Sequence, residues 1–251
     1  MIMITGGYGH LGVAISRSLI HHGATVYVLG RNRTNFDNAF RDEPELDKKL
    51  QFSNCDVAST ASIQNAFKEV FKREGHIDVL INNAFYLQGQ NPFEISDADW
   101  STGIDGTLNS VFRATREVIP YLFKNKSGRI INVSSMYGVV APDLSIYDDY
   151  PGMLNPPHYG VAKAGVGQLT KYYAGLLGKD GITVNAVAPG PFPSEKVQQK
   201  SGFIEKLAEK TCVGRIGKPE ELAGIFVYLS SDASSYTTGQ IIAVDGGWTA
   251  L

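Results

Sequence analysis

MIMITGGYGHLGVAISRSLI, residues 1–20, joins a short apolar run to a cluster of glycines and then to a helical pattern. Gly7, Gly9 and Gly12 have the spacing G-x-G-x-x-G. Between a strand and a helix, glycines at this spacing allow a sharp turn and let a pyrophosphate approach the backbone at the helix N-terminus. The stretch therefore predicts a turn that binds a dinucleotide. The alternative is a strand–helix turn that binds nothing.

The composition is that of an ordinary globular domain. The 251 residues lie near the upper end for one domain, and 43% of them are hydrophobic and 19% charged. With 23 basic and 25 acidic side chains, the net charge of -2 gives no reason to expect nucleic acid or a membrane surface as a partner. No apolar run could span a bilayer, and the first expected strand leaves no room for a signal peptide. We therefore expect one cytoplasmic domain over residues 1–251.

Cysteine and histidine give no sign of a metal site. Cys55 and Cys212 lack the spacing of metal ligands, and we expect both to be reduced thiols in the core. His21 and His22 are neighbours at the end of a helical pattern, and His76 stands apart from the other histidines. We therefore expect no bound metal.

Short β-branched runs alternate with longer helical patterns along the whole chain. Several of the runs are apolar throughout, as expected for strands that are covered on both faces. This alternation predicts an α/β fold, a Rossmann-type doubly wound parallel sheet between two helical layers. We expect a long helix over 98–124 and seven strands at residues 2–5, 25–29, 50–54, 79–82, 129–134, 183–188 and 241–244.

The end of the second expected strand indicates which dinucleotide the turn binds. In an NAD site, an acidic residue about 20 positions after the glycines holds the ribose hydroxyls. Here no acidic residue follows the glycines until Asp37, and the strand leads through Gly30 into RNR, residues 31–33. A small residue followed by arginine leaves space and positive charge for a 2′-phosphate. We therefore expect NADP(H) rather than NAD(H), held by Arg31 with Asn32 or Arg33. Alternatively, these arginines are solvated loop charges.

A tyrosine and a lysine lie four residues apart near the start of a helical stretch, at Tyr159 and Lys163. Residues at this spacing share one helix face. A lysine ammonium beside a phenol stabilises the phenolate and lowers the tyrosine pKa from its ordinary value of about 10. Such a tyrosine can exchange protons near neutral pH. Taken alone, the pattern is common and usually marks two surface residues.

In combination, these motifs resemble the short-chain dehydrogenase/reductase family over essentially the whole chain. The resemblance implies a homodimer or homotetramer and hydride transfer between a nicotinamide dinucleotide and a carbonyl/alcohol pair. It rests on motifs that occur in the family's order, at residues 5–12, 56–57, 82–84, 132–135, 159–163, 185–190 and 238–248.

The resemblance also implies roles for individual residues. Tyr159 would be the acid/base, Lys163 would bind the nicotinamide ribose, and Ser135 would orient the substrate carbonyl. The expected substrate contacts are Phe85, Met136, Tyr147, Tyr150 and Phe192. The expected cofactor-binding residues are Thr5, Gly6, Gly7, Tyr8, Gly9, His10, Leu11, Gly12, Gly30, Arg31, Asn32, Asp56, Val57, Asn83, Ala84, Tyr159, Lys163, Pro189, Gly190 and Ser194.

Three positions depart from the family pattern. His10 stands where members of this length more often have glycine, so that residues 5–12 have the spacing of the extended members, many of which act on nucleotide sugars. Phe85 replaces the glycine that usually follows NNA, which puts a large ring near the cofactor. The family's helix asparagine, to which a water-linked proton relay is attributed, aligns with Thr107. Thr107 could be a weaker substitute, and we expect nearby Asn109 to be structural.

A fourth departure is the separation of Ser135 from Tyr159, which is about twice the usual length. The proline-rich insertion at 137–158 fills it. If the two residues still converge, the insertion must lie beside the substrate, because loops at the carboxyl ends of strands carry specificity in open α/β sheets. An ordinary solvated lid or an oligomer contact is the alternative. Side chains that could bind a polyhydroxylated substrate are Tyr147, Asp148, Asp149, Tyr150, Asn155 and His158.

The sequence therefore predicts an NADP(H)-preferring oxidoreductase that interconverts a carbonyl and a secondary alcohol, on a sugar-like or polyol-like substrate. Two other function classes remain. The glycine spacing is compatible with a sugar-nucleotide epimerase or dehydratase, although the chain is short for the extra substrate domain. Phe85 and Thr107 are compatible with a non-catalytic NADP-binding sensor, although Ser135, Tyr159 and Lys163 are intact.

Overall fold

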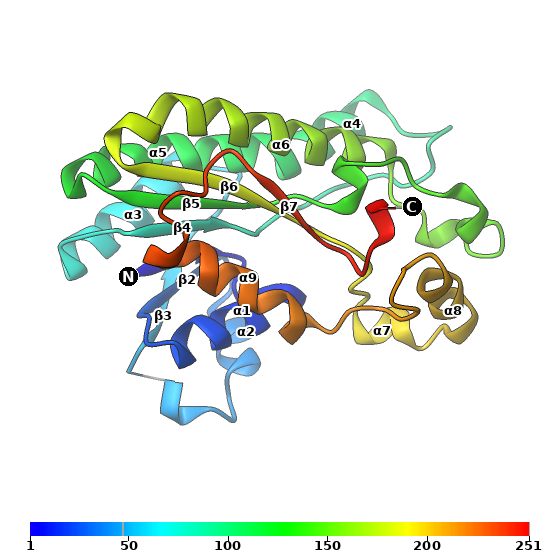
Figure 1. Ribbon diagram of the computed structural model, residues 1–251, viewed down its shortest axis with the longest axis horizontal. Coiled ribbons are helices and arrows are strands. Elements are labelled where there is room, and N and C mark those ends of the chain that lie inside the picture. The colour runs from blue at the N-terminus through cyan, green and yellow to red at the C-terminus, as the bar shows by residue number, and fades with distance from the viewer. Residues whose placement is uncertain (47, 251) are drawn as a thin grey trace.

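Seven parallel strands form one sheet in the order β3-β2-β1-β4-β5-β6-β7 (Figure 1). This computed structural model describes residues 1–46 and 48–250, so residues 47 and 251 of the expected domain lie outside the described part. The predicted doubly wound sheet is confirmed, and each expected strand ends within one residue of the observed one. The strands are β1 (Ile2–Thr5), β2 (Val26–Gly30), β3 (Leu50–Asn54), β4 (Val79–Asn82), β5 (Gly128–Val133), β6 (Ile182–Pro189) and β7 (Ile241–Val244).

Helices cover both faces of the sheet (Figure 1). Ile4 and Phe226 belong to the core under one layer, whereas Met3, Leu80 and Phe67 belong to the core under the other. Because successive side chains of a strand point to opposite faces, a strand covered twice is apolar at every position. The first layer holds α1 (His10–His21), α2 (Arg33–Ala39) and α9 (Pro219–Ser230), and the second holds α3 (Thr60–Glu74), α4 (Asp97–Ile104), α5 (Ser110–Asn125) and α6 (Pro157–Leu177).

The long helix expected over 98–124 is divided by a π-helical turn at Asp105–Asn109, which joins α4 to α5. Two glycines near this turn are needed for close packing. A Cβ at Gly103 would clash with the buried ring of His158, and one at Gly106 would clash with the carbonyl oxygen of Tyr86. The glycines that weaken the helical pattern therefore let α6 and the β4–α4 segment approach this helix closely.

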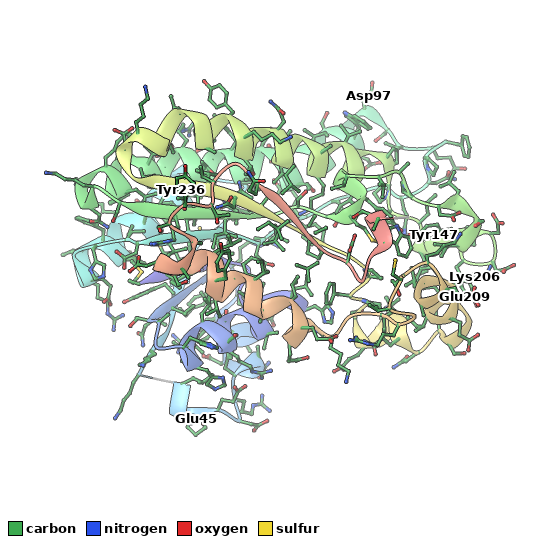
Figure 2. The ribbon with its side chains drawn as sticks, viewed as in Figure 1. Glu45, Asp97, Tyr147, Lys206, Glu209 and Tyr236 are labelled. Carbon is green, nitrogen blue, oxygen red and sulfur yellow. The ribbon has the colours of Figure 1, made fainter. Side chains whose placement is uncertain are left out.

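The insertion at 137–158 packs beyond the carboxyl ends of the strands, against α8 (Ser201–Glu209) and the C-terminal segment. Tyr147 lies beside α8 (Figure 2), and its ring centroid is 5.7 Å from that of Phe203. Its hydroxyl lies 2.6 Å from that of Tyr137. Lys206 of α8 pairs with Asp149 at 2.6 Å. The insertion is therefore joined to α8 by buried rings and by an ion pair at the surface.

The two cysteines lie in different environments. Cys55 is free and buried, whereas Cys212 is free and exposed, with its thiol 3.3 Å from the carbonyl oxygen of Gly247. The prediction of two core thiols is therefore wrong for Cys212, because the turn after α8 leaves this side chain at the surface. Within residues 1–46 and 48–250, no group of three His, Cys, Asp or Glu side chains could hold a metal ion. No helix in the same ranges is long and apolar enough to cross a membrane.

The packing at Gly103 can be tested by Gly103→Ala. We expect the free energy of unfolding to fall by about 1–3 kcal/mol, because the added methyl group must displace the fully buried His158. Urea denaturation measures the change. Gly224→Ala in α9 is the control: its Cβ meets nothing within 4 Å, so this variant should gain up to about 1 kcal/mol. A Gly103→Ala protein as stable as the wild type would contradict the packing.

Candidate functional site

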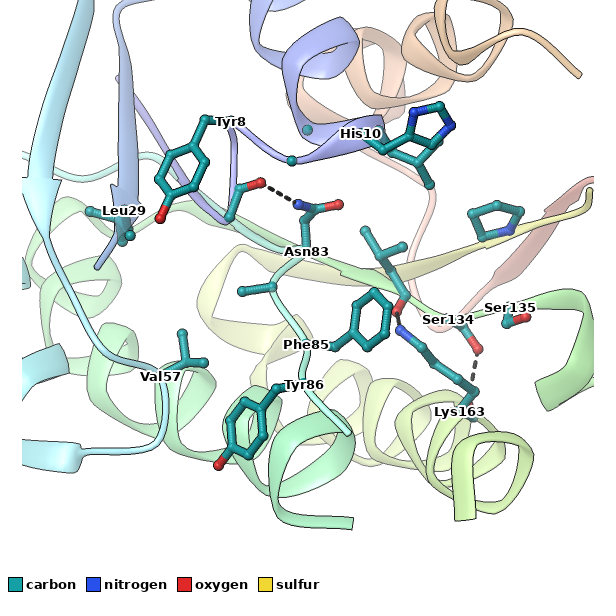
Figure 3. Close-up of a pocket in the computed structure, with 18 of the residues that line it drawn as sticks. Tyr8, His10, Leu29, Val57, Asn83, Phe85, Tyr86, Ser134, Ser135 and Lys163 are labelled. Atoms are coloured by element: carbon teal, nitrogen blue, oxygen red, sulfur yellow. Dashed lines mark hydrogen bonds between the residues drawn. The ribbon is translucent and has the colours of Figure 1, made fainter. Parts of the chain in front are cut away.

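A pocket of ≈ 460 Å³ lies at the carboxyl ends of the central strands (Figure 3). The strand order reverses between β1 and β4, and ligands of open α/β sheets bind outside the strand ends at such a switch point. The volume is within the usual range of small-molecule sites, about 300–1,000 Å³. Fold and pocket thus indicate the same place for a ligand.

Most of the expected site residues line this pocket. Those expected to bind cofactor are Gly6, Tyr8, Gly9, His10, Leu11, Gly12, Gly30, Arg31, Asp56, Val57, Asn83, Ala84, Tyr159, Lys163, Pro189 and Gly190, and Ser135, Phe85 and Phe192 join them. The lining also includes residues that the sequence analysis missed, each within two positions of an expected one: Leu29, Cys55, Tyr86, Val133 and Ser134. The sequence could have indicated these residues, because each lies next to a motif at the end of a strand.

Thr5 does not line the pocket but holds two of its walls together. Its Oγ1 accepts hydrogen bonds from the backbone N–H groups of Asn83 and Ala84, each at 3.0 Å. In return, Asn83 Nδ2 donates to the carbonyl oxygen of Thr5 at 3.0 Å. It also donates to the carbonyl oxygen of Gly6 at 2.9 Å (Figure 3). Thr5 and Asn83 therefore fix the glycine turn relative to the segment after β4.

Three other expected cofactor residues lie outside the lining. Gly7 is buried, and a Cβ there would lie 2.9 Å from Ser16 Oγ. Asn32 caps α2, because its side chain accepts from the N–H of Asn35 at 3.0 Å. Ser194 precedes the short helix α7 (Glu195–Gln198) as its N-cap residue. In this structure these three residues support the backbone around the pocket.

The N-terminus of α1 faces the pocket without a side-chain cap. Its N-cap residue is Gly9, and its first turn carries no acidic side chain. The first N–H groups of a helix have no partner within it and lie at the positive end of the helix dipole. A Cβ at Gly12 would clash with the carbonyl oxygen of Gly6. Close-packed glycines and unpaired N–H groups fit the diphosphate of a dinucleotide.

His10 links the glycine turn to a distant segment. Its Nε2 lies 3.1 Å from the carbonyl oxygen of Phe192, which follows β6. Both residues line the pocket. A glycine at position 10 could not form this contact, so the departure from the family pattern adds a connection across the pocket rim.

The two arginines after β2 differ in their partners. Arg33 Nε donates to Asp37 at 2.7 Å, and its guanidinium lies over the rings of Phe36 and Phe52. Arg31 is exposed and lines the pocket, and its guanidinium has no hydrogen-bond or ionic partner among residues 1–46 and 48–250. Of the two cations, Arg31 is the one available to an anionic ligand.

Tyr8 shapes this end of the pocket. Its ring lies against Gly30, where a Cβ would clash with the phenol. Its hydroxyl accepts a hydrogen bond from the N–H of Asn32 at 3.3 Å. The Tyr8 ring therefore requires glycine at position 30, at the end of β2. Space for a ligand is a separate reason for a small residue there.

Ser135, Tyr159 and Lys163 meet at the other end of the pocket. Lys163 is buried, and its Nζ donates to the carbonyl oxygen of Val133 at 2.6 Å. Burial lowers the pKa of Lys163 to about 7. Burial also raises the pKa of Tyr159, and the hydrogen bond with Ser135 acts in the opposite direction. The expectation of a lowered Tyr159 pKa is therefore wrong for this structure, because loss of solvent around the phenol is the larger effect.

Phe85 and Tyr86 point to opposite sides of the β4–α4 segment (Figure 3). The Phe85 ring faces Lys163 and Tyr159, and its centroid is 5.9 Å from that of Tyr159. The Tyr86 hydroxyl donates to Asp105, which also pairs with Arg113. Burial alone would raise the pKa of Asp105. Hydrogen bonds from Arg113, Tyr86 and Asn109 outweigh it and lower this pKa to about 2.

The π-helical turn contains the two residues that were compared with the family asparagine. Asn109 Nδ2 donates to Asp105 Oδ1 at 3.1 Å, so Asn109 has the structural place expected for it. Thr107 is buried, and its Oγ1 has no hydrogen-bond partner in the described part of the chain. Thr107 follows Gly106, the residue that packs against the carbonyl oxygen of Tyr86.

The insertion contributes less to the pocket than expected. Tyr147 and Tyr150 of the insertion, and Met136 just before it, pack in the cluster with α8 and do not line the pocket. His158 is fully buried, and its Nε2 lies 2.9 Å from the carbonyl oxygen of Gln88. The prediction that His158 could bind substrate hydroxyls is therefore wrong, because its ring is buried and held by Gln88.

Comparison with known proteins places the whole chain among reductases and dehydrogenases. Residues 9–249 match the family described as enoyl-(acyl carrier protein) reductase. The chain is 36% identical over 248 residues to a 3-oxoacyl-[acyl-carrier-protein] reductase of Thermotoga maritima, covering 98% of this chain and 96% of that one. It is 32% identical over 251 residues to gluconate 5-dehydrogenase of Gluconobacter oxydans, covering 98% of this chain and 93% of that one. Among solved structures, a gluconate 5-dehydrogenase from Burkholderia cenocepacia in complex with NADP and tartrate has a TM-score of 0.88 and 28% identity, covering 100% of this chain and 95% of that one.

The burial of Lys163 predicts a pH dependence that Lys163→Met removes. The pKa of Lys163 is about 7 in the folded chain, against an ordinary 10.5, so the unfolded chain binds more protons between these values. The contribution of Lys163 to the free energy of unfolding therefore rises with pH, by up to about 1.4 kcal/mol per pH unit.

The quantity to compare is the difference in unfolding free energy between the wild type and Lys163→Met. We expect this difference, wild type minus variant, to increase by about 2–3 kcal/mol from pH 7 to pH 9.5. Urea denaturation at the two pH values gives this difference. The exposed Lys68, changed to Met, is the control and should show no such increase. A difference for Lys163→Met that stays constant with pH would contradict the buried ammonium.

Proposed function

We propose, from the premise that this chain belongs to the short-chain dehydrogenase/reductase family, that it prefers NADP(H) and interconverts a carbonyl and a secondary alcohol. Membership of the family makes it an oxidoreductase. The observation that carries the finer proposal is the pocket itself. Ser135, Tyr159 and Lys163 lie at one end, and the exposed Arg31 lies at the other. We further propose that cofactor and substrate sites belong to one domain, residues 1–251.

The pocket residues fit a 2′-phosphorylated dinucleotide. We propose that the open N-terminus of α1 holds the diphosphate, that Arg31 holds the 2′-phosphate, and that Lys163 contacts the nicotinamide ribose. When bound, the cofactor supplies or accepts the hydride. The relatives add support, because the solved gluconate 5-dehydrogenase is a complex with NADP.

The chain's own residues would handle the carbonyl oxygen and its proton. We propose that the hydroxyls of Ser135 and Tyr159 donate hydrogen bonds to that oxygen and stabilise the negative charge that develops during reduction. The raised pKa keeps the Tyr159 phenol protonated at neutral pH, so it can give its proton to the oxygen. Oxidation of the alcohol needs the phenolate, and we therefore propose that reduction is favoured near neutral pH and oxidation at alkaline pH.

The substrate we propose is a hydroxylated carbonyl compound such as a keto-sugar acid. The relatives carry this choice, because Tyr150 and Asp149 of the insertion are turned to α8, where they contact Phe203 and Lys206. Two similar proteins are gluconate 5-dehydrogenases, whereas the Thermotoga relative is a 3-oxoacyl-[acyl-carrier-protein] reductase. Keto-sugar acids and 3-oxoacyl thioesters are therefore the two substrate classes to compare.

We also propose that the enzyme is a cytoplasmic homodimer or homotetramer. Large apolar side chains are exposed on neighbouring helices of one layer, where a second copy would cover them. They are Phe112 on α5 and Val161, Tyr172 and Leu176 on α6. Neither nucleic acid nor a membrane surface is proposed as a partner.

The assignment of Tyr159 is tested by Tyr159→Phe, using the best substrate from an NADPH-oxidation screen of keto-sugar acids, 3-oxoacyl thioesters and simple ketones. We expect kcat to fall by about 10²- to 10⁴-fold, because the proton donor is lost. The dissociation constant for NADPH should change less than threefold. Full turnover by Tyr159→Phe would refute the assignment, and activity confined to 3-oxoacyl thioesters would refute the sugar-acid proposal.

Arg31→Ala tests the cofactor preference. We expect the KM for NADPH to rise by about 10- to 100-fold, since a charge-assisted hydrogen bond to the 2′-phosphate is lost, while the KM for NADH changes less than threefold. Arg33→Ala is the matched control, because Arg33 is already paired with Asp37 and should have a smaller effect. An equal effect of Arg31→Ala on both cofactors would show that this arginine does not read the 2′-phosphate.

A further inference from the structure

The ring of Phe85 covers the ammonium group of Lys163. Nζ lies 5.3 Å from the centroid of the Phe85 ring and 5.7 Å from that of Tyr159. The Lys163 side chain points toward Phe85 from α6, and the ring stands within the pocket (Figure 3). Phe85 is 51% exposed, so much of its surface faces open space while it also contacts the buried cation.

Lys163 lines the pocket, but very little of the residue is exposed in this arrangement. Its ammonium group has three N–H donors, and one of them goes to the carbonyl oxygen of Val133. Lys163 is only 3% exposed, so a neighbouring group that moves aside would open Nζ further to a hydroxyl in the pocket. Val133 is held in β5 and Tyr159 in α6, which leaves the half-exposed ring of Phe85 as the neighbour that is free to turn.

The main chain on both sides of Phe85 is fixed. The N–H of Ala84 donates to Thr5 Oγ1, and the Tyr86 hydroxyl donates to Asp105. The carbonyl oxygen of Tyr86 packs so closely on Gly106 that no Cβ fits between them. Rotation of the Phe85 side chain about its Cα–Cβ bond is therefore the movement that would uncover Lys163 with the least disturbance.

We propose that Phe85 is a displaceable cover on Lys163, which shields the ammonium group from water in the free protein and turns aside when the nicotinamide half of the cofactor binds. The inference rests on the proposed function, because it takes Lys163 as the contact for the nicotinamide ribose. The ring–ammonium attraction must be given up on binding, so the cover weakens the affinity for the whole dinucleotide. The adenosine half binds at the other end of the pocket and is unaffected.

Calorimetric titration with two probes tests the cover. NADP⁺ carries both halves of the cofactor, whereas adenosine 2′,5′-bisphosphate carries only the adenosine half. For Phe85→Ala we expect about 2- to 30-fold tighter binding of NADP⁺, which is the range that the strength of a cation–π contact implies, and unchanged binding of the bisphosphate. Phe85→Leu keeps most of the bulk of the side chain but lacks the aromatic face. Its affinity for NADP⁺ should lie between those of the wild type and Phe85→Ala. Phe93→Ala is the matched control, because Phe93 is 96% exposed in the same β4–α4 segment and should leave both affinities unchanged.

A second measurement needs no cofactor. Modification of lysines by trinitrobenzenesulfonate, followed site by site with mass spectrometry, should be several-fold faster at Lys163 in Phe85→Ala than in the wild type. The rate at the exposed Lys68 should be the same in both proteins.

The outcomes separate the cover from the proposed function. Equal or weaker NADP⁺ binding by Phe85→Ala would overturn the cover, since the ring would then support the nicotinamide half. Equal modification of Lys163 in the two proteins would overturn it as well. If the wild type binds neither probe, the proposed cofactor is wrong, and the modification rates alone then decide whether Phe85 shields Lys163.

Discussion

The pocket depends on how β1 and β4 part at their carboxyl ends. After these neighbouring strands the chain turns to opposite faces of the sheet, so main-chain groups at the junction lose their ladder partners and must find others. Two side chains supply them: Thr5 Oγ1 accepts from the N–H groups of Asn83 and Ala84, and Asn83 Nδ2 donates to the carbonyl oxygens of Thr5 and Gly6. These hydrogen bonds keep the glycine turn and the Phe85 segment at a fixed separation, and the pocket lies between them.

The two ends of this pocket differ in their electrostatics. At the end of β2, the exposed Arg31 keeps its charge in contact with solvent. At the start of α6, burial disfavours the charged forms of both Lys163 and Tyr159, so the pKa of the lysine falls and that of the phenol rises. An anionic group is therefore favoured at the first end. A neutral carbonyl that needs a proton is suited to the second.

Local patterns predicted the strands and the glycine turn, because apolar runs and glycine spacing are set within a few residues. Contacts between distant segments decided the rest. Spacing placed Tyr159 and Lys163 on one helix face, but packing around α6 buries Lys163 and partly buries Tyr159. The loss of solvent around the phenol reversed the expected direction of the Tyr159 pKa. Tyr147 turned toward Phe203 instead of the pocket, because α8 offers the insertion an apolar face that no local pattern reveals.

The segment that carries Phe85 is also joined to the insertion. Gln90 Nε2 donates to the carbonyl oxygens of Gly152 and Leu154, at 2.8 and 2.9 Å. His158, at the start of α6, contacts the carbonyl oxygen of Gln88. A movement of this segment as a whole would therefore break hydrogen bonds to the insertion and disturb the start of the helix that carries Tyr159. Because these connections and the Tyr86–Asp105 contact hold the main chain in place, a change at Lys163 is confined to the Phe85 ring, and the mouth of the site keeps its shape while the ring turns.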